Sequence, residues 1–234
     1  MFAQLLHWVN LLLSIVFFFP TKDSRPRVRS FPWMTVLIVA LNVLVTVAIA
    51  YVLPYAVSSV EAQARIVTPF IMVPADIVAG EGLGAVTAIT AAFLHAGWDH
   101  LLGNMFLLVF FGRALEDILG PVKLGLFYLT CILGSALLSI VGRVALPLEQ
   151  GTVPILGASG AVMGLVAGYL FLFFEERIRT LPMFMGVIPV PISLWMPAWA
   201  FFVPIALRDL ISAYLEQYVQ EYGFTYSATA VFAH

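Results

Sequence analysis

Long apolar runs separated by short polar segments are the main pattern along this chain. A helix that crosses the hydrocarbon core of a bilayer needs about 20 mostly apolar residues, because that core is about 30 Å thick. Runs of this length predict five spanning helices, over residues 33–53, 91–111, 122–141, 155–174 and 183–207. A last apolar stretch runs from Phe224 to His234, and we expect it to be the truncated start of a sixth span.

The composition agrees with a membrane protein, since 62% of the 234 residues are apolar and only 10% are charged. A soluble domain carries about 25% charged residues, and a disordered chain is poor in apolar ones. The sequence therefore predicts an all-α, polytopic membrane helical bundle. The net charge of −2 and the absence of a basic run do not indicate a nucleic-acid partner. The single cysteine, Cys131, excludes an internal disulfide.

The segment before the first predicted span is apolar over residues 4–19 and ends at Pro20. It lacks the early basic region and the small-residue cleavage site of a secretory signal. We interpret it as an interfacial or re-entrant anchor, with a short extra span as the alternative. With the basic stretch that follows, residues 1–30 are predicted to form an N-terminal cytoplasmic or interfacial segment, and residues 31–234 the membrane domain.

The basic residues predict the orientation of the chain, because cytoplasmic loops carry an excess of Lys and Arg. If the spans alternate, one side of the membrane carries Lys22, Arg25, Arg27, Arg29, Arg113, Lys123, Arg177 and Arg179, and the other carries Arg65, Arg143 and Arg208. This distribution puts the N-terminus in the cytoplasm and makes residues 54–90 a long external loop. Gly80, Gly82 and Gly84 predict a break in regular helix within that loop.

Polar side chains gather at the start of the second predicted span, where they are costly in a bilayer. His100 and Asn104 are four residues apart, so they lie on nearly one face of a helix. His95 would point about 140° away from His100 in the same helix and contact a different neighbour. The alternative to a functional site is that these groups only hydrogen-bond the external loop or another helix.

The fourth predicted span opens with Gly157-Ala-Ser159-Gly160. Gly160, Gly164 and Gly168 repeat every four residues, which is typical of close helix packing in membranes and explains the segment without any chemistry. The alternative interpretation is that Ser159 is a nucleophile. Flanking glycines would give a reacting carbonyl access, and the free N–H groups at a helix start could stabilise an oxyanion.

His234 is the third polar group of interest, preceded by the small residues Ser227, Ala228, Ala230 and Ala233. It is the last residue given, so it could equally be solvated and without function. The predicted topology favours a role. The second, fourth and sixth spans all run from outside to inside, and His100, Ser159 and His234 lie near their outer ends. All three can therefore meet in the outer half of the bilayer.

These residues resemble the rhomboid family of intramembrane serine proteases. The family's His-x4-His-x3-Asn pattern matches His95, His100 and Asn104, and its Gly-x-Ser-Gly pattern matches Gly157, Ser159 and Gly160. Residues 233–234 are similar to the start of its Ala-His-x-x-Gly segment, and residues 112–120 to its Gly-x3-Glu-x3-Gly stretch. The chain departs from the family at residues 85–90, which lack the Trp-Arg pair that many rhomboids carry before the second helix.

The resemblance implies a rhomboid-like core of six helices and a serine endopeptidase with a Ser159–His234 dyad. Asn104, His100 and the Ser159 backbone N–H would stabilise the oxyanion, with His95, Gly157 and Gly160 supporting them. The substrates would be transmembrane proteins cut in or near their helices, and neither a metal nor an organic cofactor is implied. The expected location is the plasma (inner) membrane of a prokaryote. The alternatives are a catalytically inactive rhomboid-like protein that binds transmembrane clients and, less favoured, a small transporter or channel.

Overall fold

The structure is a computed structural model that describes residues 16–24, 30–145, 150–184, 188–203, 205–207 and 211. The chain divides into two compact units, one formed by Val28–Ala167 and the other by Met1–Arg27 together with Gly168–His234. The described part is mostly helical, with one small sheet that belongs to the second unit. Each unit is described by itself below.

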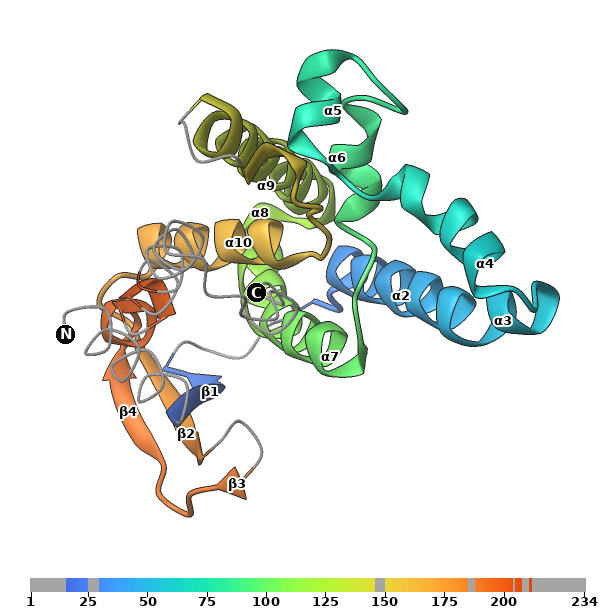
Figure 1. The fold of residues 1–234 in the computed structure, drawn as a ribbon. Coiled ribbons are helices and arrows are strands. Elements are labelled where there is room, and N and C mark those ends of the chain that lie inside the picture. The colour runs from blue at the N-terminus through green and yellow to red at the C-terminus, as the bar shows by residue number, and fades with distance from the viewer. Residues whose placement is uncertain are drawn as a thin grey trace, which may run out of the picture. The chain divides into compact units, whose positions relative to one another are not determined.

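The first unit begins with a long apolar helix. Helix α2 (Trp33–Val47) continues through a π-helical turn (Ala48–Val52) into α3 (Leu53–Ala56), as Figure 1 shows. Together they form a helix of 24 residues that is long and apolar enough to cross a membrane. The helix predicted over residues 33–53 is therefore confirmed; that it spans a membrane stays a prediction.

A second long helix, α9 (Pro121–Ile140), continues to Arg143 and is also long and apolar enough to span a bilayer, with 23 residues. Pro121 stands in its first turn, where the missing N–H is not needed. This confirms the helix predicted over residues 122–141. Among the described residues no other helix is both as long and as apolar as these two, so a six-helix core remains a prediction, and its sixth helix lies outside the described residues.

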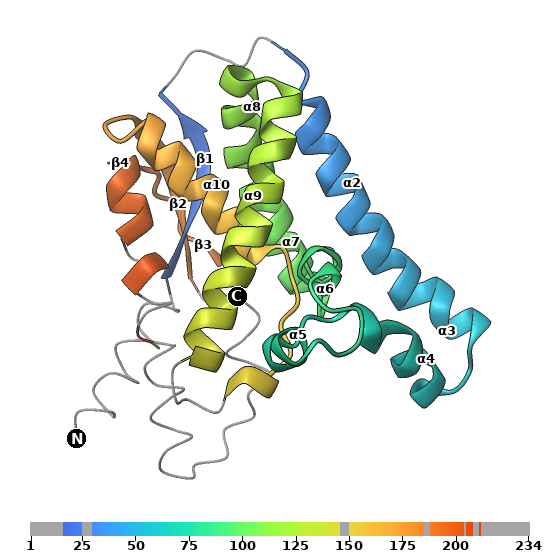
Figure 2. The same cartoon turned by 90° about the horizontal axis from the view of Figure 1, so that it is seen from above.

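Four short helices occupy most of the predicted external loop. They are α4 (Val60–Val67), a 3-10 turn (Thr68–Phe70), α5 (Pro74–Ala79) and α6 (Val86–Ala91). The glycines between α5 and α6 have φ values of 74°, 59° and 54°, which confirms the predicted break in helix there. Figure 2 shows α5 and α6 beside α9, and residues from all three form one apolar cluster.

The second predicted span begins later than its apolar run suggests. Helix α6 ends at Ala91, residues 92–97 are not helical, and α7 (Trp98–Leu107) starts only at Trp98. A π-helical turn (Leu108–Gly112) then leads into α8 (Arg113–Leu119). The predicted start at residue 91 is therefore wrong. That prediction used only the length of the apolar run, which does not indicate the extended backbone that Gly97 adopts before α7.

A buried carboxylate joins α8 to the start of α2. Glu116 is 3% exposed, and it accepts hydrogen bonds from Met34 N at 2.8 Å, Thr35 N at 2.9 Å and Thr35 Oγ1 at 2.7 Å. The first backbone N–H groups of a helix have no partner within the helix, and the positive end of its dipole favours an anion. Glu116 therefore caps α2 from another helix.

Helix α10 (Ser159–Leu172) packs on α9 through its glycines. A Cβ atom on Gly160 would lie 2.5 Å from Ser135 Oγ, and one on Gly164 would overlap the side chain of Cys131. The two helices thus approach so closely that only glycine fits at these positions. The packing role of the small-residue stripe is confirmed for Gly160 and Gly164, and α10 begins at Ser159 rather than at residue 155.

The second unit contains an antiparallel sheet of four strands, β1 (Val16–Asp23), β2 (Arg177–Phe184), β3 (Ile188–Pro189) and β4 (Leu194–Pro197). Strand β2 pairs with β1 along one edge and with β3 and β4 along the other. A helix follows β4 and covers residues 198–203 and 205–207.

The sheet corrects two predictions. In the fifth predicted span, residues 183–207, the described residues before Ala198 are not helical, because this part contains Pro189, Pro191 and Pro197 and pairs as strands. The fold is consequently not all-α. Residues 16–23, taken as the end of an interfacial or re-entrant anchor, form strand β1. Residues 1–15 of that anchor lie outside the described part.

Candidate active site

The candidate site in the first unit starts from the buried face of α7. His100 and Asn104 are 5% and 7% exposed, and they stand one turn apart on this helix, as their spacing predicts. Both side chains are held by a helix whose first turn begins directly after Gly97. A histidine and a carboxamide therefore project together into the interior of this unit.

Gly157 brings a second segment against this pair. A Cβ atom on Gly157 would lie 2.6 Å from His100 Cε1, 2.9 Å from His100 Nε2 and 3.8 Å from Asn104 Nδ2. Its φ of 114° is also one that L side chains rarely adopt. Only glycine permits the backbone to pass this close to the imidazole, so the structure brings Gly157 against His100 and near Asn104.

Ser159 follows two residues later as the first residue of α10. Ala158, the residue before the helix, is fully buried, and its carbonyl accepts a hydrogen bond from Val162 N at 2.9 Å. Ser159 itself is partly buried. It therefore combines a hydroxyl with the free N–H groups of a helix start, beside a segment that touches His100 and Asn104.

Backbone hydrogen bonds fix the segment that carries Gly157. Gly157 N donates to the carbonyl of Ala91 at 2.9 Å, and Met72 and Ile155 exchange two bonds, at 3.2 and 2.7 Å. Backbone hydrogen bonds from the predicted external loop and the residue after it thus fix the segment that leads into α10. Sequence analysis did not find Ala91, Met72 or Ile155 as supporting residues, because their contribution comes from the main chain, which leaves no signal in residue type.

His95 does not behave as the helical spacing predicts. Its ring packs edge-on against His100, with centroids 5.1 Å apart and planes at 65°. The expected separation of about 140° applies only within a helix, and His95 precedes the start of α7. The prediction that it contacts a different neighbour is therefore wrong, and His95 belongs to the same cluster as His100.

Asn104 presents a buried donor that is not used within the described part of the chain. Its Nδ2 atom is shielded from solvent and has no hydrogen-bond partner among the described residues. Buried polar atoms are nearly always paired, so this donor requires an explanation, and a partner supplied by a ligand is one. The arrangement suits a ligand oxygen that accepts from the Asn104 amide.

The chemistry of this cluster is that of a hydroxyl beside hydrogen-bond donors. No group of three or more potential metal-ligating side chains occurs among the described residues. Ser159, Gly157, Gly160, Asn104, His100 and His95 all lie in the first unit. His234, the predicted base, lies outside the described residues, so its pairing with Ser159 stays a prediction.

Comparison with known proteins identifies the family. The model of the rhomboid domain matches residues 84–234, which is more than half of the chain. The chain belongs to the rhomboid family. Several rhomboid relatives are similar to it over shorter segments. The mitochondrial RHOMBOID-like protein 6 of Arabidopsis thaliana is 31% identical over 117 residues, which cover 47% of this chain and 36% of the relative.

Two other relatives are more similar over part of the rhomboid domain. The chloroplastic Rhomboid-like protein 11 of Arabidopsis thaliana is 43% identical over 34% of this chain and 26% of its own length. The YdcA protein of Bacillus subtilis, named provisionally as a rhomboid protease, is 37% identical over 44% of this chain and 52% of its own length. The chain thus spans about half or less of these rhomboid relatives. No solved structure matches it.

Proposed function

We propose that this rhomboid-family chain is an intramembrane serine endopeptidase that cuts transmembrane helices of other membrane proteins with a Ser159–His234 dyad. The close approach of Gly157, two residues before Ser159, to His100 and the nearby Asn104 is the observation that carries the proposal. This contact sets two side-chain donors beside a serine at a helix start, which is the arrangement that acyl transfer requires.

In the first step, Ser159 Oγ attacks the scissile carbonyl while His234 accepts the hydroxyl proton. The tetrahedral intermediate then expels the amine, which takes that proton from His234 and leaves an acyl ester on Ser159. Water, deprotonated by His234, hydrolyses the ester and restores the hydroxyl. We propose a dyad rather than a triad, because the one acidic residue within the predicted spans, Asp99, is exposed at the start of α7.

The negative charge of the intermediate needs donors aimed at the developing oxyanion. In this proposal the Ser159 backbone N–H, the Asn104 carboxamide and His100 supply them. The unused Asn104 Nδ2 supports this role, because a donor without a partner in the described part is available to an incoming oxygen. Such donors contribute about 10²–10³ in rate each.

The proposed substrates are membrane proteins whose helices unwind locally before attack, because a helix hides its peptide carbonyls. Substrates with Gly or other weak helix formers near the outer end of the span should therefore be favoured. We also propose a multi-pass location with a cytoplasmic N-terminus, supported by the uneven distribution of Lys and Arg. A prokaryotic plasma membrane stays a prediction, since the relatives include plant organellar proteins.

The test is cleavage of a transmembrane test substrate by the full chain in proteoliposomes. Ser159→Ala and His234→Ala should each abolish cleavage, whereas Ser139→Ala and His7→Ala serve as matched controls and should retain it. A fluorophosphonate probe should label the parent and fail to label Ser159→Ala, because the probe reacts with an activated serine.

Three outcomes distinguish the alternatives. Labelling that persists in Ser159→Ala would remove Ser159 as the nucleophile. Substrate that co-purifies with the chain without being cut, and no probe labelling, would favour the inactive binder of transmembrane clients. Solute flux through the proteoliposomes without any peptide cleavage would favour a transporter.

A further inference from the structure

One face of the sheet in the second unit gathers basic and aromatic side chains. Partners in an antiparallel register lie on the same face, so the pairing of Lys22 with Arg179 and of Arg179 with Trp195 puts these three in one row. Arg177 stands two residues before Arg179 on β2 and shares its face. All four side chains are exposed. We refer to Lys22, Arg177, Arg179 and Trp195 as the basic face.

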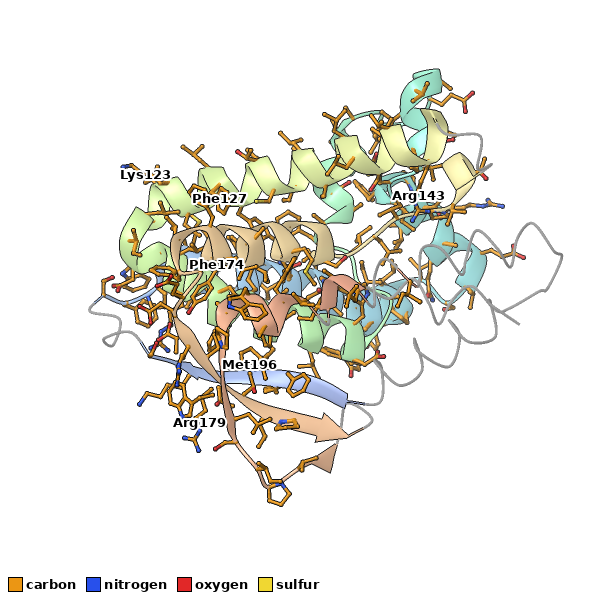
Figure 3. The ribbon with its side chains drawn as sticks, turned by 90° about the vertical axis from the view of Figure 1, so that its left-hand side faces the viewer. Lys123, Phe127, Arg143, Phe174, Arg179 and Met196 are labelled. Carbon is orange, nitrogen blue, oxygen red and sulfur yellow. The ribbon has the colours of Figure 1, made fainter. Side chains whose placement is uncertain are left out.

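The opposite face of the sheet is buried along β2. Ile178 and Thr180, which alternate with the arginines along β2, are both 0% exposed. Figure 3 shows Arg179 pointing outward from the sheet, on the side away from Met196, the register partner of Ile178. The sheet therefore has its buried β2 side chains on one face and the basic face on the other, where the apolar residues Leu181 and Pro197 also lie.

The cations of the basic face are not neutralised within the described residues. Arg179 Nη2 donates to Ser193 Oγ at 3.1 Å, which keeps the guanidinium on this face. Two carboxylates lie near this face. Glu176 accepts from Ser24 Oγ, which itself accepts from Arg177 N, and Asp23 is in register with Ile178 on the other face. Among the described residues, Lys22, Arg177 and Arg179 form no ion pair.

Two apolar helices set the depth of the basic face. Strand β2 starts shortly after α10 ends at Leu172, and β4 ends at Pro197, directly before the apolar helix Ala198–Leu207. Ala198 N donates to the carbonyl of Glu176 at 2.8 Å, so both helices meet the sheet at the same end. The pair Arg177–Pro197, where β2 begins and β4 ends, therefore lies within a few residues of both apolar helices.

This distance corresponds to the headgroup layer of a bilayer. Two residues of strand cover about 7 Å, and the headgroup layer of each leaflet is about 5–8 Å thick. Arg177 and Arg179 would therefore fall at the depth of the lipid phosphates. Trp195, in the same row, has the amphipathic ring that is enriched at membrane–water interfaces.

We propose that the basic face binds the phosphate headgroup of an anionic phospholipid, in the leaflet at which α10 ends. Three cations that form no ion pair within the described part of the chain supply the complementary charge, and Trp195 contacts the glycerol and upper acyl region. This site is separate from the proposed peptidase chemistry, because none of its residues belongs to the cluster around Ser159.

The test measures lipid retention by the purified full chain in detergent, by native mass spectrometry. The chain is offered phosphatidylglycerol or phosphatidylcholine with identical acyl chains, and the parent should retain phosphatidylglycerol preferentially. Neutralising one cation should weaken that retention about fivefold, as expected for a basic residue at an anionic surface. The triple variant Lys22→Gln, Arg177→Gln, Arg179→Gln should lose about a hundredfold.

A matched control removes three exposed cations from the first unit, with Arg65→Gln, Arg113→Gln and Lys123→Gln together, and should retain the lipid as the parent does. The triple exchange Lys22→Arg, Arg177→Lys, Arg179→Lys keeps the charge and should also retain it. Ser159→Ala should bind normally, so a failed peptidase proposal would leave this one standing.

A second measurement does not depend on the folding of the triple variant. Brominated phosphatidylglycerol should quench the tryptophan fluorescence of the parent more than that of Trp195→Phe. The proposal is overturned if the folded triple variant retains the lipid, if the matched control loses it equally, or if Trp195→Phe leaves quenching unchanged. Displacement by millimolar inorganic phosphate would assign the site to free phosphate instead of a lipid.

Discussion

The backbone at Gly157 passes so close to His100 that a Cβ atom there would lie 2.6 Å from the imidazole carbon Cε1. Because of this close approach, a side chain at position 157 would push the start of α10, which includes Ser159, away from α7. The first prediction tests this effect.

Gly157→Ala should lower the cleavage rate by about 10²–10³, because the added methyl group would push the His100 side chain away from the oxyanion that it is proposed to stabilise. The alanine would also have to adopt a φ of 114°, which is strained for a residue with a side chain. Gly103→Ala on α7 is the matched control, since an added Cβ meets nothing within 4 Å there. Single-turnover cleavage in proteoliposomes measures both. Equal rates for Gly157→Ala and the parent would show that the contact is irrelevant to activity.

Asn104→Leu should lower the catalytic rate without lowering the thermal stability of the chain. If the Asn104 amide serves only the transition state, kcat should fall about 10²–10³ with little change in KM. The melting temperature should not fall, because the variant removes a buried donor that has no partner among the described residues.

Asn42→Leu is the comparison for this prediction. Asn42 is also buried, but it lies on α2 and its Nδ2 donates to the carbonyl of Ile38 at 2.8 Å. This variant should keep its cleavage rate. A loss of melting temperature in Asn104→Leu, with unchanged kcat, would make Asn104 a structural residue.

Glu116→Gln should destabilise the first unit by about 1–3 kcal/mol, because the Glu116 carboxylate accepts three hydrogen bonds from Met34 and Thr35. A carboxamide keeps only one acceptor oxygen and loses the charge that the start of α2 favours. Thermal unfolding in detergent, compared with Glu81→Gln on an exposed turn, measures the effect. A melting temperature equal to that of the control variant would contradict the capping role.

The parts of the fold that were predictable from sequence are those set by local composition. Helices α2 and α9 coincide with long apolar runs, because a helix satisfies its own backbone hydrogen bonds and needs only length to cross a bilayer. The pairing of His100 with Asn104 follows from the helical repeat in the same way. Their contact with Gly157 was expected from the motifs but depends on two segments far apart in the chain.

The sheet was not predictable by this reasoning, because its strands pair across most of the chain. Thr21 and Arg179, which share a hydrogen bond, are separated by 158 positions. An apolar run of moderate length fits a strand as well as a helix, and only Pro189, Pro191 and Pro197 argued against the helix. The prediction for His95 was wrong for a related reason. The direction of its side chain depends on where α7 begins, and the apolar run does not indicate that position.

Gly164→Ala tests the packing of α10 on α9 away from the proposed chemistry. The new Cβ would lie 2.6 Å from Cys131 Cβ and 3.6 Å from Cys131 Cα, so α9 and α10 must separate. Such overpacking should cost about 1–3 kcal/mol of the free energy of unfolding. Cys131→Gly should restore part of that loss when combined with Gly164→Ala, because it removes the atoms that the methyl group meets. Gly134→Ala, whose Cβ meets nothing within 4 Å, should have almost no such effect. Additive losses in the double variant, measured by thermal unfolding, would show that Gly164 and Cys131 are not in contact.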